Sequence, residues 1–96
     1  MSRILIADDH DSLRRGLAQG IAEAGHDVEE AANGNTAIEK LHDSYFDVIV
    51  SDLKMGGSTG LEVLKTAKQL HPTCAVILIP VIPGTSNALP RLRTPR

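Results

Sequence analysis

Three aspartates directly follow short apolar segments of the sequence. Asp8 and Asp9 follow the segment RILIA, and Asp52 follows the segment DVIVS. If both segments are buried parallel strands, their carboxyl ends meet at the crevice where open α/β sheets bind ligands. Three carboxylates at one such edge offer the oxygen ligands that Mg²⁺ prefers. The positions of these aspartates therefore predict a magnesium site.

Two simpler explanations of these aspartates stay open. The acids that follow the first segment could only cap the next helix, and Asp52 could be an ordinary loop acid, because aspartate is common at both kinds of position. Their joint occurrence with the spacing of Met55 and Gly60 favours the site. The four histidines show no metal-ligand spacing, and we expect them to face solvent: His10, His26, His42 and His71.

Strand and helix patterns alternate along the chain and would position these aspartates. We predict strands at residues 4–7, 26–31, 47–51 and 74–79, and helices at residues 12–24, 36–42 and 59–70. Helices between successive strands imply parallel pairing with right-handed crossovers. If the first strand is central and the order is 2-1-3-4, as in flavodoxin-type sheets, the expected fold is a flavodoxin-like open α/β sheet. In this fold the three aspartates converge at the topological switch point.

Local signals indicate where the helices begin and which face they bury. Asp11 is placed to cap the first helix, and Thr59 starts the third with a glutamate three residues later, which is capping-box spacing. In the first helix Leu13, Leu17 and Ile21 recur at helical spacing. We expect these three side chains to form the face that packs on the sheet.

Composition is ordinary for one small globular domain of 96 residues. The formal net charge is −2, which favours neither direct nucleic-acid binding nor an acidic interaction tail. The single cysteine, Cys74, excludes an intrachain disulfide and suits a reducing compartment. No apolar run approaches the roughly 20 residues of a membrane span, and the first residues lack a signal-peptide pattern. We therefore expect a cytoplasmic protein without membrane contact.

The regular pattern ends near Ile79. Residues 80–96 contain prolines and arginines but no acids, and proline interrupts helices and central strands. We therefore expect an α/β domain at residues 1–79 and an irregular tail at residues 80–96. A C-terminal truncation, or a shifted reading frame after about Ile79, would explain the break.

Four segments carry a specific resemblance: ILIADDH at residues 4–10, ANG at 32–34, DVIVSDLKM at 47–55 and GLEVL at 60–64. They resemble bacterial two-component response-regulator receiver domains, the chemotaxis receiver among them. The resemblance implies that Asp52 accepts a phosphoryl group from a sensor histidine kinase. It also implies Mg²⁺ as the cofactor, bound by Asp8, Asp9, Asp52 and the backbone carbonyl of Lys54. Such a protein is a signalling module and not an enzyme, apart from its own phosphorylation and dephosphorylation.

The chain also departs from the receiver pattern. The family carries Ser or Thr at the end of its fourth strand and a lysine at the end of a fifth, and both contact the phosphoryl group. Here the fourth strand ends in Ile79 and Pro80, the expected fold lacks the usual fifth strand and helix, and Gly56 replaces a proline after Met55. These departures predict that metal binding persists while phosphorylation-driven switching is impaired.

Loss of a fifth strand would leave residues 74–79 as an apolar sheet edge, which is a template for pairing with another chain. We therefore predict a homodimer through this strand or through exchange of the tail.

The alternative function is a non-phosphorylated pseudo-receiver that acts as a dimerising interaction module. A phosphohydrolase of the haloacid dehalogenase type fits less well, because Lys54 stands where such enzymes place a second aspartate.

Overall fold

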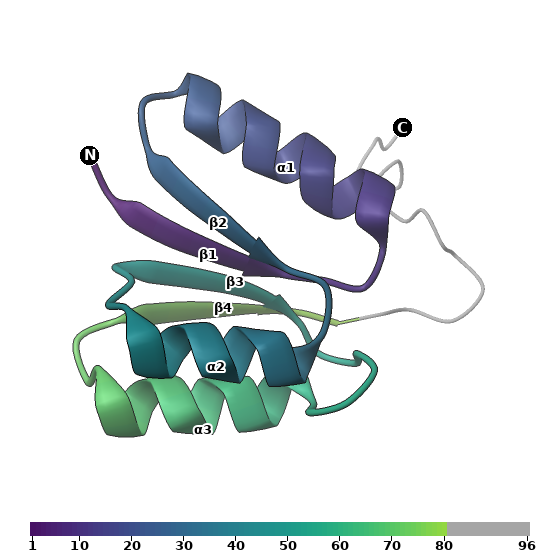
Figure 1. Ribbon diagram of the computed structural model, residues 1–96, viewed down its shortest axis with the longest axis vertical. Helices are drawn as coiled ribbons and strands as arrows, with labels where there is room; N and C mark the ends of the chain where they lie inside the picture. The colour runs from purple at the N-terminus through teal and green to yellow at the C-terminus, as the bar shows by residue number, and fades with distance from the viewer. Residues whose placement is uncertain (81–96) are drawn as a thin grey trace, which may run out of the picture.

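Four parallel strands alternate with three helices in the computed structural model, which describes residues 1–80 (Figure 1). The strands lie in the order β2-β1-β3-β4, which confirms the predicted flavodoxin-like topology. The expected absence of a fifth strand, and the expected tail, concern residues that lie outside the described part. The elements in chain order are β1 Arg3–Ala7, α1 Asp11–Glu23, β2 Asp27–Ala31, α2 Gly34–Asp43, β3 Val48–Asp52, α3 Gly60–Leu70 and β4 Ala75–Ile79.

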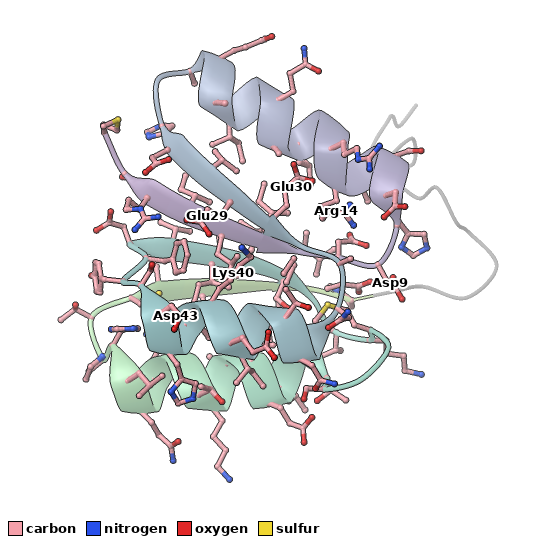
Figure 2. All side chains as sticks on the ribbon, viewed as in Figure 1. Asp9, Arg14, Glu29, Glu30, Lys40 and Asp43 are labelled. Atoms are coloured by element: carbon pink, nitrogen blue, oxygen red, sulfur yellow. The ribbon has the colours of Figure 1, made fainter. Side chains whose placement is uncertain are left out.

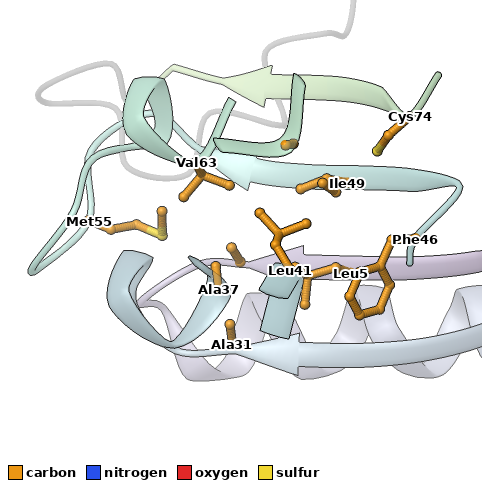
Figure 3. Close-up of a cluster of buried hydrophobic side chains, with 11 residues drawn as sticks. Leu5, Ala31, Ala37, Leu41, Phe46, Ile49, Met55, Val63 and Cys74 are labelled. Atoms are coloured by element: carbon orange, nitrogen blue, oxygen red, sulfur yellow. The ribbon is translucent and has the colours of Figure 1, made fainter. Parts of the chain in front are cut away.

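The helices cover both faces of the sheet: α1 lies on one face, and α2 and α3 lie side by side on the other (Figure 1). The central strand β1 is therefore covered on both sides, which explains its continuous apolar sequence. Leu5 and Ile49, on neighbouring strands, point into the core under α2 and α3, where Phe46 is the largest fully buried side chain (Figure 3). Cys74 is buried in the same cluster, as expected for a small core residue.

Of the two helix caps predicted from the sequence, one is confirmed. Thr59 and Glu62 form the predicted capping box at the start of α3. At α2 the Asn33 side chain accepts a 2.8 Å hydrogen bond from the backbone N–H of Thr36. The predicted cap at Asp11 is wrong, because α1 begins at that residue and its carboxylate accepts a hydrogen bond from Arg14 instead.

The buried face of α1 also differs from the prediction. Leu17 and Ile21 pack partly buried against the sheet, but Leu13 is 43% exposed. The helix instead buries Arg14 and Ala18. Burial of Arg14 is possible because its guanidinium donates hydrogen bonds to three oxygens, which offsets the loss of water.

No helix within residues 1–80 is long and apolar enough to cross a membrane. The longest helix, α1, has 13 residues, against roughly 20 for a bilayer span.

We predict that Gly60→Ala destabilises the fold by about 1–3 kcal/mol, because a Cβ at this position has no room. It would lie 2.4 Å from the backbone carbonyl oxygen of Asp52. Gly16→Ala is the matched control, since nothing lies within 4 Å of its added Cβ and it is a helix position. This control should stabilise by about 0.5–1 kcal/mol. Urea unfolding of both variants measures the difference, and equal stabilities would contradict the close approach at Gly60.

Candidate functional site

The three predicted aspartates lie together at the carboxyl end of the sheet. β1 pairs in parallel with β3, with Ala7 opposite Ser51, so the residues that follow each strand are neighbours. One ligand atom from each of Asp8, Asp9, His10 and Asp52 lies within 4.8 Å of the others. Figure 2 shows Asp9 at this edge of the sheet, where the chain leaves β1 and enters α1. The sequence thus predicted the convergence of all three aspartates.

Asp8 is the most firmly held of the acids. Its residue is 5% exposed, and its Oδ1 accepts hydrogen bonds from the backbone N–H of His10 at 2.8 Å and from the His10 ring at 3.0 Å. The backbone N–H of Asp8 continues the β1–β2 ladder to the carbonyl of Ala31 at 3.0 Å. Asp9, by contrast, keeps a side chain that is 43% exposed. The site therefore has a fixed inner acid and an outer acid open to solvent.

Asp52 is buried at the end of β3 and is 3% exposed. Burial raises the pKa of its carboxyl group, and the negative charge of Asp8 raises it further. The one hydrogen bond to this carboxylate within residues 1–80 comes from the backbone N–H of Lys54 at 3.4 Å, and it lowers the pKa. A buried carboxylate with so few donors calls for a cation.

Lys54 borders the site through its backbone. Its N–H faces Asp52 Oδ1, while its side chain is exposed. A role for the Lys54 carbonyl as a metal ligand stays a prediction.

His10 belongs to the site, which the sequence reasoning missed. Its Nδ1 lies 3.0 Å from Asp8 Oδ1 and 3.2 Å from Asp9 Oδ1. The hydrogen bond with Asp8 raises the pKa of the imidazole, and the charges of Asp8 and Asp9 add to the effect. Its position directly after Asp9 in the turn between β1 and α1 was the signal available in the sequence. The predicted exposure of His10 is confirmed, with 65% of its side chain exposed, but its contact with the two acids was not predicted.

Arg14 holds the backbone of the site in place, a role that was not predicted from the sequence. Its guanidinium donates to the backbone carbonyl of Asp8 at 2.9 Å, to Asp11 at 2.8 Å and to Glu30 on β2 at 2.9 Å. Figure 2 shows Arg14 and Glu30 facing each other between α1 and the sheet. The residue is 6% exposed. These bonds fix the backbone of Asp8 relative to α1 and β2.

The donor set fits a hard divalent cation. Two of the three carboxylates are buried, the third is open to solvent, and several of their oxygens have no hydrogen bond within residues 1–80. Mg²⁺ is bound in proteins by one or two carboxylates while it keeps several waters. The exposure of Asp9 and His10 leaves room for those waters.

The parallel sheet, its strand order and the acidic cluster at the switch point define a flavodoxin-like α/β domain with a candidate metal site at the carboxyl ends of its strands. The model of the response regulator receiver domain family matches residues 4–88. The chain therefore belongs to the response regulator receiver domain family, which confirms the resemblance noted in the sequence.

Individual relatives agree with this assignment. The chain is 32% identical over 79 residues to the response regulator receiver protein CpdR of Brucella abortus, covering 82% of this chain and 66% of CpdR. It is 37% identical over 75 residues to response regulator RR06 of Streptococcus pneumoniae, covering 78% of this chain and 35% of RR06. The chain thus spans less than two thirds of these relatives.

A solved structure shares the fold at similar identity. The response regulator TrrA of Thermotoga maritima, crystallised in complex with Mg²⁺ and BeF, matches with a TM-score of 0.78 and 29% identity. The match covers 93% of this chain and 77% of the TrrA chain.

We predict that Asp52→Asn stabilises the metal-free protein at neutral pH. The pKa of the folded state is raised above 3.8, so in the window above 3.8 the folded protein holds a proton that the unfolded chain has lost. The contribution of the Asp52 carboxyl group to the free energy of unfolding therefore falls as pH rises through that window, and it stays lower at higher pH. The advantage of Asp52→Asn over wild type should be largest at about pH 8 and vanish below the unfolded pKa. Urea unfolding with a chelator present measures this difference, and a variant less stable than wild type at neutral pH would contradict it.

Proposed function

We propose that this receiver domain accepts a phosphoryl group on Asp52 from a sensor histidine kinase, with Mg²⁺ bound by Asp8, Asp9 and Asp52. The observation that carries the proposal is the buried Asp52 carboxylate, which lies within 4.8 Å of two further carboxylates at the switch point of the sheet. Family membership supports a phosphoacceptor role in two-component signalling. The Mg²⁺ in the TrrA complex supports the choice of metal by analogy.

The chemistry follows from the positions of the acids. An oxygen of the Asp52 carboxylate attacks phosphorus, and the bond from phosphorus to the kinase histidine nitrogen breaks, so that nitrogen leaves with the electron pair. Bound Mg²⁺ would neutralise the charge that develops on the transferring phosphoryl oxygens. Asp8 is held by His10 and the ladder to β2, so it stays in place during the transfer.

The surroundings of Asp52 support weak sensing of the phosphate. In the register of the sheet, Asp52 lies opposite Ile79 on β4, and Leu53 N–H donates to the Ile79 carbonyl at 2.9 Å. The next residue is Pro80. Neither Ile79 nor Pro80 offers a hydroxyl to a phosphoryl group on Asp52. A hydrogen bond to a charged group contributes about 1.5–3 kcal/mol. Without a hydroxyl that donates such a bond to the phosphoryl group, the coupling between phosphorylation and conformational change is weaker.

We predict that acetyl phosphate with Mg²⁺ labels Asp52 transiently and shifts the conformation of β4 little. Intact-protein mass spectrometry should show the mass of one phosphoryl group, and this gain should require Mg²⁺ and be absent in Asp52→Asn. Asp43→Asn is the matched control, because Asp43 is an exposed acid at the end of α2 and should leave labelling unchanged.

Two outcomes would contradict this account. Labelling that persists in Asp52→Asn would exclude Asp52 as the acceptor. A stoichiometric, long-lived phosphorylated form with large amide shifts along β4 would show that switching does not need a hydroxyl at this strand end.

A second candidate function, a dimerising interaction module, is favoured by the β4 edge. β4 pairs with β3 alone within residues 1–80, and its alternate side chains are exposed, with Ile77 at 53% and Ile79 at 38%. An antiparallel pairing of two copies centred on Ile77 would place Ala75 opposite the partner's Ile79. Opposed residues share a face in such a pair, so the exposed apolar side chains would form one strip across both copies. The strand carries no charge that would oppose itself.

We predict a dimer in light scattering at micromolar concentration, with Ile77→Lys shifting the mass to that of a monomer. Leu61→Lys is the control, because Leu61 is 58% exposed but lies on α3. The two variants introduce the same charge at similar exposure, so only pairing through β4 separates them. A monomeric wild type, or equal masses for both variants, would contradict the β4 interface.

A further inference from the structure

We propose that His10 supplies a nitrogen ligand to the metal site, so that this receiver binds transition-metal dications such as Ni²⁺ in preference to Mg²⁺. The inference rests on the proposed metal site and concerns which cation that site selects. The observation behind it is that His10 lies next to Asp8 and Asp9. A magnesium site formed by carboxylate oxygens alone would leave His10 without a role.

The distances suit a shared cation. Nδ1 of His10 lies 3.0 Å from Asp8 Oδ1 and 3.2 Å from Asp9 Oδ1. Adjacent ligand atoms around an octahedral ion with bonds of about 2.1 Å lie about 3.0 Å apart. Both distances from the ring nitrogen are therefore close to the spacing of neighbouring ligands, and the ligand atoms of Asp8 and Asp9 lie within 4.8 Å of each other. The Asp52 carboxylate completes the set within 4.8 Å.

Three further features make His10 available as a ligand. The residue occupies the N-cap position of α1, but its side chain makes no capping hydrogen bond. Its side chain is 65% exposed, so the ring can adjust without disturbing the core. The backbone N–H of His10 donates to Asp8 Oδ1 at 2.8 Å, which ties the histidine and the carboxylate to one turn of chain. The buried Asp52 carboxylate, with one long hydrogen bond from Lys54, independently calls for a cation here.

Ligand chemistry then sets the preference. Carboxylates and water suit Mg²⁺, whereas an imidazole nitrogen suits Ni²⁺, Zn²⁺ and Cu²⁺. Affinity of a mixed nitrogen and oxygen site rises from Mn²⁺ through Co²⁺ and Ni²⁺ to Cu²⁺. Replacing one water of a three-carboxylate site by imidazole therefore strengthens binding of Ni²⁺ far more than binding of Mg²⁺.

The test is calorimetric titration of tag-free protein with Ni²⁺ and, separately, with Mg²⁺. His10→Ala should weaken Ni²⁺ binding by at least about tenfold, a loss typical of removing even an outer-shell partner of a metal. Mg²⁺ binding should change by less than about twofold, because water can replace the lost contact. His42→Ala is the control, since His42 is exposed on α2 and lies in no such cluster of the described residues. Ni²⁺ should also broaden the ring resonances of His10 before those of the other histidines.

Other outcomes overturn the inference. If His10→Ala leaves Ni²⁺ affinity unchanged, the ring is not a ligand. If the variant strengthens both metals alike, the imidazolium only competes with cations for the carboxylates. Labelling of Asp52 by acetyl phosphate is measured separately with Mg²⁺. If Asp52 is labelled but His10→Ala leaves Ni²⁺ affinity unchanged, only this inference is contradicted. If His10→Ala weakens Ni²⁺ binding but Asp52 is not labelled, only the proposed function is contradicted.

Discussion

The buried carboxylate of Asp52 beside Asp8 is the interaction on which the rest of the structure depends. Burial raises the pKa of Asp52, and the charge of Asp8 adds to that effect. Such a pair is unfavourable without a cation, and it persists because parallel pairing of β1 with β3 holds the two strand ends together. The sheet thus holds together an acidic cluster whose members would otherwise separate. Natural proteins keep such costs at sites of function.

The surrounding elements limit movement of this acidic cluster. Arg14 links the Asp8 backbone to α1 and β2 through three hydrogen bonds. On the other side, Gly60 allows α3 to begin against the Asp52 carbonyl, to within a distance that excludes a Cβ. The capping box at Thr59 then satisfies the first turn of α3. The acidic cluster and the starts of α1 and α3 are therefore connected through backbone contacts. A substitution at Gly60 or Arg14 would shift the backbone that carries Asp52 or Asp8.

The sequence predicted the fold and the three acids because both depend on strong, short-range patterns. Continuous apolar runs are typical of strands buried in a parallel sheet. The strand order 2-1-3-4 was adopted from flavodoxin-like sheets, because the right-handed crossover rule alone does not set it. His10 was missed because its closeness to Asp8 comes from a turn and not from a periodic ligand spacing. Arg14 was missed because a helical arginine is usually exposed. Leu13 was misplaced for the same reason, since the face of α1 is set by where Arg14 finds its partners.

The apolar sequence of the edge strand β4 does not show which surface covers its side chains. β4 is apolar enough for a central strand, but within residues 1–80 it has a single neighbour, and Ile77 stays half exposed. Apolar sequence indicates what a strand would bury, but not which surface buries it.

Beryllofluoride binding followed by fluorine NMR tests the central claim most directly, because this compound mimics a phosphoryl group on a carboxylate and needs no kinase. We expect the wild-type protein to show bound fluoride resonances that appear only with Mg²⁺ and are absent in Asp52→Asn. Bound resonances that persist in Asp52→Asn, or none at saturating beryllofluoride and Mg²⁺ on folded wild-type protein, would contradict the assignment of Asp52 as the phosphoryl acceptor.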